Sequence, residues 1–362
     1  MNKQKNAIVC NTPFQVLGAL NIVINNLYDG DFDLYLYGEF RDADSIYQNL
    51  TNLRIFNKIY YWKENKKRHK SKIHTFFNLI NMNCLLRDFV FSDDSFKTEA
   101  YKKVFIGDSN FIGVYLTQKN KTADLILFDD GIGSYIGNAL FDTIGKLHYI
   151  LGITFNLGIF KYKVSKLLIN NMAFCKSTIT NNVEQLPILN SENIVYDIAK
   201  KVFTFNMDSP ILRKTVVYLG QPLEEKQGYN GKTSLFFLDY IPSLKNKIIV
   251  RAHPRQCMED FNNCEIDNIN NMWELECINS ITNSHILLSF CSTAQIMPKL
   301  ISDKEPYIIF LFKLFVDSYE TNEYKNDIAI YESIKSIYRD KEKVFLPENL
   351  EDLRLFINKI SQ

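Results

Sequence analysis

The sequence lacks the short motifs that identify a metal or nucleotide site by themselves. It contains no HExxH, no pair of histidines at metal-ligand spacing and no CxxC, so nothing supports a zinc site. It contains no GxxxxGKS or GxxxxGKT, no complete GxGxxG and no GxSxG, so a P-loop, a dinucleotide fingerprint and a serine-hydrolase elbow are equally unsupported. We therefore expect chemistry that uses neither a metal nor a cofactor.

An excess of charge of one sign is also missing. The 362 residues include 42 Lys and Arg against 41 Asp and Glu, a formal net charge of +1. This balance supplies no long-range field that would attract a nucleic acid. We predict that nucleic acid is not a partner.

Long apolar runs are absent as well. None reaches the roughly 18–20 residues that cross a bilayer. Lysines precede an apolar stretch at the N-terminus, but Asn11, Thr12 and Pro13 interrupt it and no small-residue cleavage site follows. The cysteines are odd in number and most lie in apolar runs, which indicates reduced core residues. We expect a cytoplasmic protein.

Short apolar runs alternate with longer helical patterns along the chain. The predicted strands are NAIVC, FDLYLYG, KIYYW, KVFIG and DLILFDD, then TVVYLGQ, KIIVRAH, HILLSF and PYIIFL. Continuous apolar strands between helices indicate parallel sheets covered on both faces. The predicted fold is α/β, with two doubly wound domains facing each other across a cleft. The expected domains are residues 1–210, with a helical excursion at about 136–205, residues 211–345, and a closing C-terminal helix over 346–362.

Two stretches of the first domain have open interpretations. Residues 147–169 are apolar at first and then include Lys161, Lys163 and Lys166. They fit an amphipathic helix on a membrane surface or a partner subunit, or an ordinary helix packed on its own domain. The basic stretch 62–72 is interpreted as a solvated loop.

Ligands of open α/β sheets bind outside the carboxyl ends of the strands. The segments that follow the predicted strands include NTPFQ, DDGIGS, GQPLEE, HPR and CSTA. All are polar, small or titratable, as residues that contact a ligand should be. The candidate site residues are therefore sought there.

RAHPRQ is the most informative of these segments. Proline pushes the residue before it into an extended conformation, so His253 is expected at a strand end. Arg251 and Arg255 flank it and suit an anionic ligand such as a phosphate. The alternative is a histidine satisfied in the core or in a turn.

SFCSTA places Ser289, Ser292 and Thr293 between a buried strand and an apolar helix. Hydroxyls and free N–H groups at a helix start bind an anion, although plain N-capping selects the same residue types. Glu274, at the start of a preceding helix, suits a ribose diol, or simply complements the helix dipole.

Asp129 and Asp130 follow a strand and precede Gly131. An Asp-Gly pair is a common turn signal. Two adjacent carboxylates at a strand end also fit a general base, because one can raise the pKa of the other. Both interpretations stay open on these residues alone.

In order along the chain, NTPFQVLGAL, FDDGIGSY, YLGQPL, RAHP and SFCSTA resemble the bacterial sialyltransferases of glycosyltransferase family 52, which act on lipooligosaccharide and capsule. The resemblance spans residues 6–300. It implies a GT-B fold and an inverting, metal-independent transfer of sialic acid from CMP-sialic acid to a terminal galactose, typically at O3. It admits a homodimer and a peripheral contact at the inner face of the plasma membrane.

The resemblance also implies roles for the candidate residues. Asp130, with Asp129 beside it, acts as the base, and His253 stabilises the departing phosphate. Contacts to CMP are assigned to Ser292, Thr293, Glu274, Pro254, Gly220, Gln221 and Arg251. Thr12 and Gln15 lie on the donor-sugar side.

Alternatives remain for the base and for the function. Glu224 and Glu225 lie on a loop that can supply the base instead. Position 225 is a glutamate, so this loop lacks the shorter aspartate side chain. Another GT-B transferase, a polysialyltransferase or a non-catalytic glycan-binding relative is the alternative function.

Overall fold

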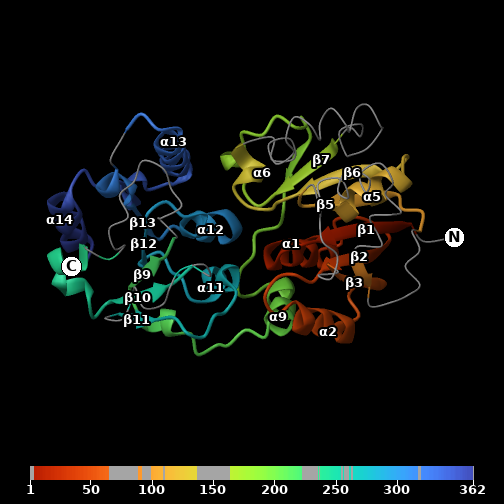
Figure 1. Cartoon of the computed structure of the whole chain (residues 1–362), viewed down its shortest axis with the longest axis horizontal. Coiled ribbons are helices and arrows are strands. Elements are labelled where there is room, and N and C mark those ends of the chain that lie inside the picture. Colours follow the sequence, from red (N-terminus) through yellow and green to blue (C-terminus); the bar gives the residue numbers. More distant parts are fainter. Residues whose placement is uncertain are drawn as a thin grey trace. The chain divides into compact units, whose positions relative to one another are not determined.

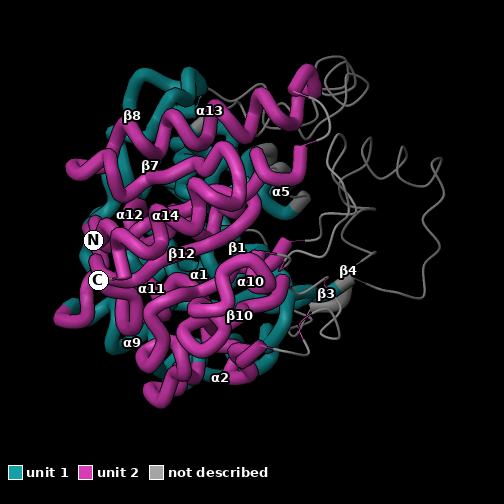
Figure 2. The backbone as a smooth tube through the Cα atoms, turned by 90° about the vertical axis from the view of Figure 1, so that its left-hand side faces the viewer, with its two compact units in different colours: residues 1–187, 193–203 teal, residues 188–192, 204–362 magenta. Residues whose placement is uncertain are grey.

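The computed structural model describes residues 4–64, 89–91, 99–108, 111–136, 164–221, 235, 237–253, 256, 261, 264–316 and 319–361. The chain forms two compact units, residues 1–187 with 193–203 and residues 188–192 with 204–362, which Figure 2 colours separately. Each unit is built around its own sheet (Figure 1).

The first unit contains an eight-stranded sheet in the order β4-β3-β2-β1-β5-β6-β7-β8. Its strands are β1 (Lys5–Cys10), β2 (Asp31–Tyr37), β3 (Lys58–Glu64), β4 (Phe89–Phe91), β5 (Lys103–Ile106), β6 (Asp124–Phe128), β7 (Val164–Ile169) and β8 (Val183–Gln185). All neighbours are parallel except β3 and β4. The register pairs Val9 with Ile106 and Ile106 with Leu127. The carboxyl ends of β1, β5 and β6 therefore meet at one edge.

The helices of the first unit are α1 (Pro13–Ile24), α2 (Ala43–Leu53), α5 (Phe111–Lys119), α6 (Gly133–Ile136) and α9 (Ile194–Val202). Helix α1 begins directly after β1, because Thr12 caps it and Pro13 occupies its first turn. The Thr12 hydroxyl accepts a hydrogen bond from the Gln15 backbone N–H at 3.2 Å. This start places Gln15 over the edge where β1, β5 and β6 end.

The second unit contains a six-stranded sheet in the order β11-β10-β9-β12-β13-β14, and its neighbours are parallel. The strands are β9 (Val216–Leu219), β10 (Ile248–Arg251), β11 (Glu265–Ile266), β12 (Ile286–Ser289), β13 (Tyr307–Phe310) and β14 (Val344–Phe345). The helices are α10 (Phe237–Tyr240), α11 (Trp273–Asn279), α12 (Thr293–Ser302), α13 (Asn322–Ile337) and α14 (Leu350–Ile360). Strands β9 and β12 are buried throughout, which explains their continuous apolar sequences.

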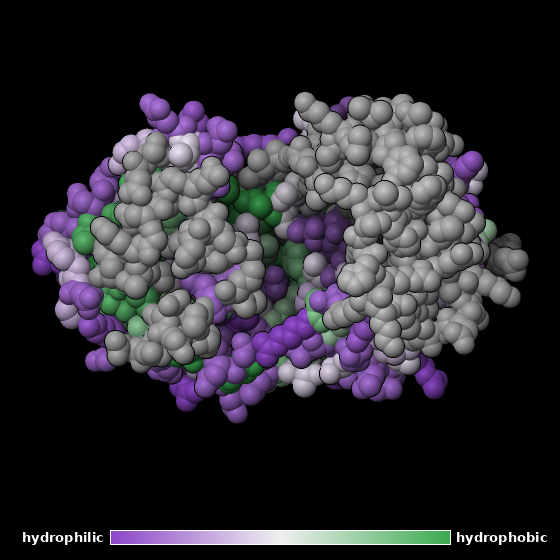
Figure 3. Space-filling model, in the orientation of Figure 1, coloured by the Kyte–Doolittle hydropathy of each residue, from purple (hydrophilic) through white to green (hydrophobic). Residues whose placement is uncertain are grey.

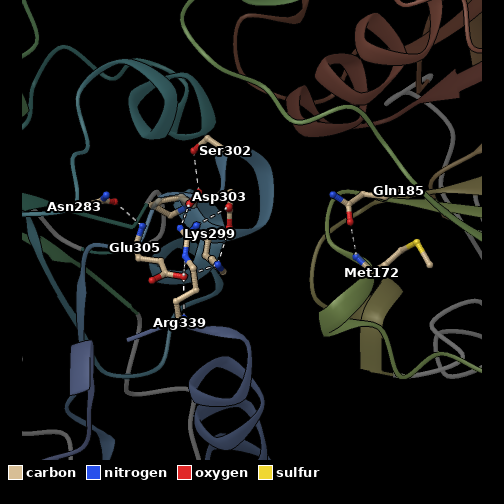
Figure 4. A network of polar contacts seen from close by, with 9 residues as sticks. Met172, Gln185, Asn283, Lys299, Ser302, Asp303, Glu305 and Arg339 are labelled. Carbon is tan, nitrogen blue, oxygen red and sulfur yellow. Dashed lines mark hydrogen bonds and ion pairs between the residues drawn. The ribbon is translucent and has the colours of Figure 1, made fainter. Parts of the chain in front are cut away.

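An ion-pair network with a buried centre, Lys299 and Glu305, lies at the amino end of β13 in the second unit (Figure 4). The Lys299 ammonium lies 2.6 Å from Glu305 Oε1 and 2.6 Å from Asp303 Oδ1. The Arg339 Nε–H donates to the same Glu305 oxygen at 3.0 Å. Lys299 and Glu305 are each only 5% exposed.

All nine predicted strands are present, and the C-terminal residues form α14 as expected. In the described part of the helical excursion predicted at about 136–205, α9 is helical as expected, whereas β7 and β8 extend the sheet. Residues 164–169, the end of the expected amphipathic helix 147–169, are the strand β7 between β6 and β8. The Lys166 side chain pairs with Glu184 on β8, so this lysine belongs to a strand. Residues 137–163 and 65–72 lie outside the described residues.

Within the part of the chain that is described, no helix has both the length and the apolar content needed to cross a membrane. On the face drawn in Figure 3, the described residues are mainly hydrophilic, with smaller apolar areas. The five described cysteines are free, and Cys10, Cys277 and Cys291 are buried.

Candidate functional site

Asp130 is half-buried at the carboxyl end of β6. Its Oδ1 accepts a hydrogen bond from Gln15 Nε2 at 2.7 Å. Its backbone N–H donates to the Ser134 hydroxyl at 3.0 Å. Among the described residues, none donates a hydrogen bond to Oδ2.

Gln15 fixes the Asp130 carboxylate. The Gln15 Oε1 accepts the Asn11 backbone N–H at 2.6 Å, which leaves the amide NH₂ to face Asp130. Gln15 is fully buried, and its side chain packs directly against Gly107, where an added Cβ would lie 2.6 Å from Gln15 Nε2. A glycine directly after β5 therefore makes room for the glutamine that orients Asp130.

Asp129 is buried and its carboxylate is used within the fold. Its Oδ1 accepts the Gly131 N–H at 2.8 Å, and its Oδ2 accepts Asn170 Nδ2 at 2.7 Å and the Asn170 N–H at 3.2 Å. The Tyr135 hydroxyl also donates to Oδ2. Burial raises the pKa of Asp129, and these hydrogen bonds oppose that rise. Asp129 thus fixes the loop that carries Asp130.

Gly131 has a φ of 103°, in the left-handed region that favours glycine. We expect Gly131→Ala to destabilise the chain by roughly 1–2 kcal/mol, from backbone strain alone. An added Cβ would meet no atom within 4 Å, so no steric clash contributes. Urea unfolding measures the effect, and an unchanged free energy of unfolding contradicts it.

Asp108 is a member of this cluster that the sequence analysis missed. It follows β5, between the ends of β1 and β6. Asn11 Nδ2 donates to both of its oxygens, at 2.8 and 3.0 Å. The rule that found Asp130, a polar residue directly after a predicted strand, also applies to the GDSN that follows KVFI.

The environment of Asp130 favours its neutral form. Burial is the largest cause, and the negative charges of Asp108 and Asp129 add to it, while the Gln15 hydrogen bond opposes them. Together they raise the pKa of Asp130 to about 7. A carboxylate with this pKa suits general base catalysis near neutral pH.

In the second unit, His253 lies half-buried, two residues after β10. Its backbone N–H donates to Gln256 Oε1 at 3.1 Å, and Gln256 Nε2 donates to the Gln221 carbonyl at 2.7 Å. At Gly220 an added Cβ would lie 2.0 Å from Gln256 Oε1. The loops that follow β9 and β10 are thereby joined through one glutamine.

Gln221 joins the ends of β9 and β12. Its Nε2 donates to the Cys291 carbonyl at 2.9 Å, and its Oε1 accepts the Cys291 N–H at 2.8 Å. The buried Ser289 hydroxyl donates to the Leu219 carbonyl at 2.6 Å. Gln221 and Ser289 thus brace two strand ends, and the direct contact of Gln221 with a nucleotide remains a prediction.

Ser292 caps α12. Its hydroxyl accepts the Ala294 N–H at 3.2 Å, and the Gln295 side chain accepts the Ser292 N–H at 3.3 Å. Thr293 is exposed in the first turn. Trp273 Nε1 donates to the Ala294 carbonyl at 2.7 Å, which ties the start of α11 to that of α12. The exposed start of α12 can bind an anion.

Arg251 is bound within the fold. Its Nη1 lies 2.6 Å from Asp267 Oδ2, its other terminal nitrogen donates to the Asn271 carbonyl, and the guanidinium lies 5.4 Å from the Trp273 ring centroid. Glu274 is half-buried. Burial raises the pKa of Glu274, against the nearby charge of Arg251. The structure thus brings Arg251 and Glu274 together and holds Arg251 within the fold, while its contact with CMP remains a prediction.

Four residues proposed for the site from the sequence, Pro254, Arg255, Glu224 and Glu225, lie outside the described residues. Of the remainder, Thr12, Gln15, Asp129 and Asp130 lie together in the first unit. The others lie at the carboxyl edge of the second sheet, near the adjacent ends of β10, β9 and β12. Within the described part of the chain, no group of three or more His, Cys, Asp or Glu could hold a metal ion.

Comparisons with known proteins agree with this architecture. A family model described as alpha-2,8-polysialyltransferase (POLYST) matches residues 8–305. A crystal structure of UDP-N-acetylglucosamine 2-epimerase is similar at a TM-score of 0.50 with 11% identity, covering 99% of this chain and 87% of that one. The Neisseria meningitidis UDP-GlcNAc 2-epimerase bound to UDP-GlcNAc gives 0.46 and 12%, covering 99% of both chains. Curated protein sequences include no match. The chain has the GT-B fold, with two Rossmann-like domains.

Proposed function

Since the chain is a member of the alpha-2,8-polysialyltransferase family, a bacterial sialyltransferase family, we propose that it transfers sialic acid from CMP-sialic acid to a glycan hydroxyl. The family match confirms the coarser expectation that the chain is related to bacterial sialyltransferases. The assignment to glycosyltransferase family 52 stays a prediction.

The observation that supports the proposal is the setting of Asp130. One carboxylate oxygen is held by Gln15, burial and two carboxylates raise the pKa to about 7, and Oδ2 accepts no hydrogen bond from the described residues. A hydroxyl nucleophile needs a positioned base of this kind.

In the proposed step, the acceptor hydroxyl oxygen forms a bond to the anomeric carbon of the donor sugar. The bond from that carbon to the phosphate oxygen breaks, and its electron pair leaves with CMP. The hydroxyl proton moves to Asp130. Attack on the face opposite the leaving group inverts the anomeric configuration, and no metal is required by this scheme.

We assign the nucleotide to the second unit. The α12 start at Ser292 and Thr293 suits the phosphate, because its N–H groups and hydroxyls are hydrogen-bond donors. His253 would stabilise the departing phosphate, and the Glu274 carboxylate would accept hydrogen bonds from the ribose hydroxyls. Pro254, Gly220 and Gln221 complete the nucleotide contacts in this proposal. Thr12 lies on the donor-sugar side, and the fully buried Gln15 serves that side by holding Asp130.

The acceptor has two candidates. The first is a terminal galactose of lipooligosaccharide or capsule, joined by an α2,3 linkage. The second is a terminal sialic acid, extended through α2,8 linkages, and the family description favours it. Both need the same base and the same donor.

CMP release from CMP-sialic acid in EDTA tests the function. Wild type is compared with His253→Ala, using lactose, an α2,8-linked sialic acid trimer or no acceptor. Release that depends on lactose supports the galactose acceptor, and release that depends on the trimer supports chain extension. Absence of both release and CMP binding overturns the proposal.

The proposed base also predicts a pH dependence. Asp130 accepts a proton only when ionised, so kcat/KM should rise with pH and reach half of its maximum near pH 7. Initial rates of CMP release from pH 5 to 9 measure this. A midpoint below pH 5 would contradict the role of Asp130.

A further inference from the structure

Asp108 touches none of the reacting atoms in the step proposed above, although it lies in the same cluster. It follows β5, which is hydrogen-bonded to β1 on one side and to β6 on the other. Its carboxylate is therefore at the carboxyl edge between the strands that lead to Gln15 and to Asp130. Asn11 fixes it there through both carboxylate oxygens.

Asn11 connects Asp108 to Asp130. The Asn11 side chain donates to Asp108, and its backbone N–H donates to Gln15 at 2.6 Å. Gln15 in turn donates to Asp130 at 2.7 Å. One residue at the end of β1 thus orients both carboxylates, directly in one case and through a buried glutamine in the other.

We infer that Asp108 is a positioning residue for the transfer, whose negative charge makes Asp130 a better proton acceptor. The inference rests on the proposed function and adds a residue to it. Asp108 acts through Asp130 and needs no contact with the reacting atoms.

The groups that face Asp130 support this assignment. From its own loop comes Asp129, whose charge is offset by hydrogen bonds from Gly131, Asn170 and Tyr135. From β1 comes the buried Cys10 thiol, whose pKa is raised well above its usual value by burial, so it is neutral. After burial, Asp108 is the strongest influence that raises the pKa of Asp130, and none of the influences resolved from the described residues comes from a cation.

The first test is the pH–rate profile of Asp108→Asn, with the acceptor that supports CMP release by wild type. We expect the acid limb to move to lower pH by about one unit, because one like charge near Asp130 is lost. The plateau rate should fall a fewfold, since a weaker base transfers the proton more slowly, and the acceptor KM should not change.

Asp124→Asn is the matched control, because it removes a carboxylate from the opposite end of β6. Its profile should superimpose on that of wild type.

The second test does not need activity. The folded chain favours protonated Asp130, so its free energy of unfolding should fall as pH rises from about 4 towards 7. Urea unfolding across this range should show a smaller fall in Asp108→Asn. The part of this fall that is due to Asp130 should vanish in Asp130→Asn. The variant that combines Asp108→Asn with Asp130→Asn should have the same pH profile of stability as Asp130→Asn alone. If wild type transfers no sialic acid but this coupling is present, the proposed function fails while the coupling stands.

Two results overturn the inference. One is an Asp108→Asn variant whose acid limb and stability profile both match those of wild type. The other is loss of turnover at every pH to the extent seen in Asp130→Asn, because Asp108 would then be the base itself.

Discussion

Asp130→Asn should slow sialyl transfer by roughly 10²–10⁴-fold, the usual contribution of a general base. Asparagine has nearly the same shape, and its amide oxygen can accept the hydrogen bond that Gln15 donates to Asp130. The loop is therefore retained while the proton acceptor is lost. Single-turnover CMP release measures the effect, and calorimetry should show that CMP still binds.

Stability provides the control for this variant. Because the folded state disfavours ionised Asp130, the asparagine should be at least as stable as wild type above pH 7. The advantage should disappear near pH 4, where the aspartate is protonated in the folded state. A variant that retains full turnover would exclude Asp130 and direct attention to Glu224 and Glu225.

Lys299→Met should destabilise the second unit by about 3–5 kcal/mol, the usual cost of removing one partner of a buried ion pair. Glu305 would keep Arg339 but lose the ammonium 2.6 Å from its Oε1. Urea unfolding measures the loss. The exposed pair of Lys359 and Glu342 is the control, and Lys359→Met should cost less than about 1 kcal/mol.

The same pair predicts a dependence on acid. Burial would raise the pKa of Glu305, but Lys299 and Arg339 outweigh it and lower that pKa. The stabilisation is therefore present above the unfolded pKa and is lost as pH falls through the folded pKa.

Equal losses of unfolding free energy in Lys299→Met and Lys359→Met would contradict a buried Lys299–Glu305 pair. Glu305→Gln in the Lys299→Met background should recover part of the loss, because no buried charge remains unpaired.

The sequence predicts the central strands well, because a strand buried on both faces has a continuous apolar sequence. The edges are harder to predict. Strand β7 includes Ser165 and Lys166, whose side chains reach neighbouring strands, so its pattern is not apolar throughout. Strands β11 and β14 are two residues long and leave almost no periodic signal.

Asp130 could be predicted from its place after a strand, but its partners could not. The Gln15 contact joins residues 115 positions apart, and only the order of β1, β5 and β6 brings them together. Asp129 and Asp130 look equivalent in the sequence. They differ in burial, since Asp129 is 2% exposed and surrounded by donors, whereas Asp130 is half-buried and only its Oδ1 accepts a hydrogen bond from a described residue.

A glycine packed against the amide of a buried or half-buried glutamine is found in the described part of each unit. Gly107 lies beneath the Gln15 amide, and Gly220 lies beneath the Gln256 amide. A side chain at either glycine would displace the glutamine that secures the neighbouring loop, whereas shortening the glutamine alone would leave that loop unsecured. In a library of variants, the losses from substitutions at 15 and 107, and at 256 and 220, should therefore be non-additive, because once the glutamine is shortened a side chain at the glycine displaces nothing further. Scans of single positions would make each residue look immutable, although what is fixed is the pair.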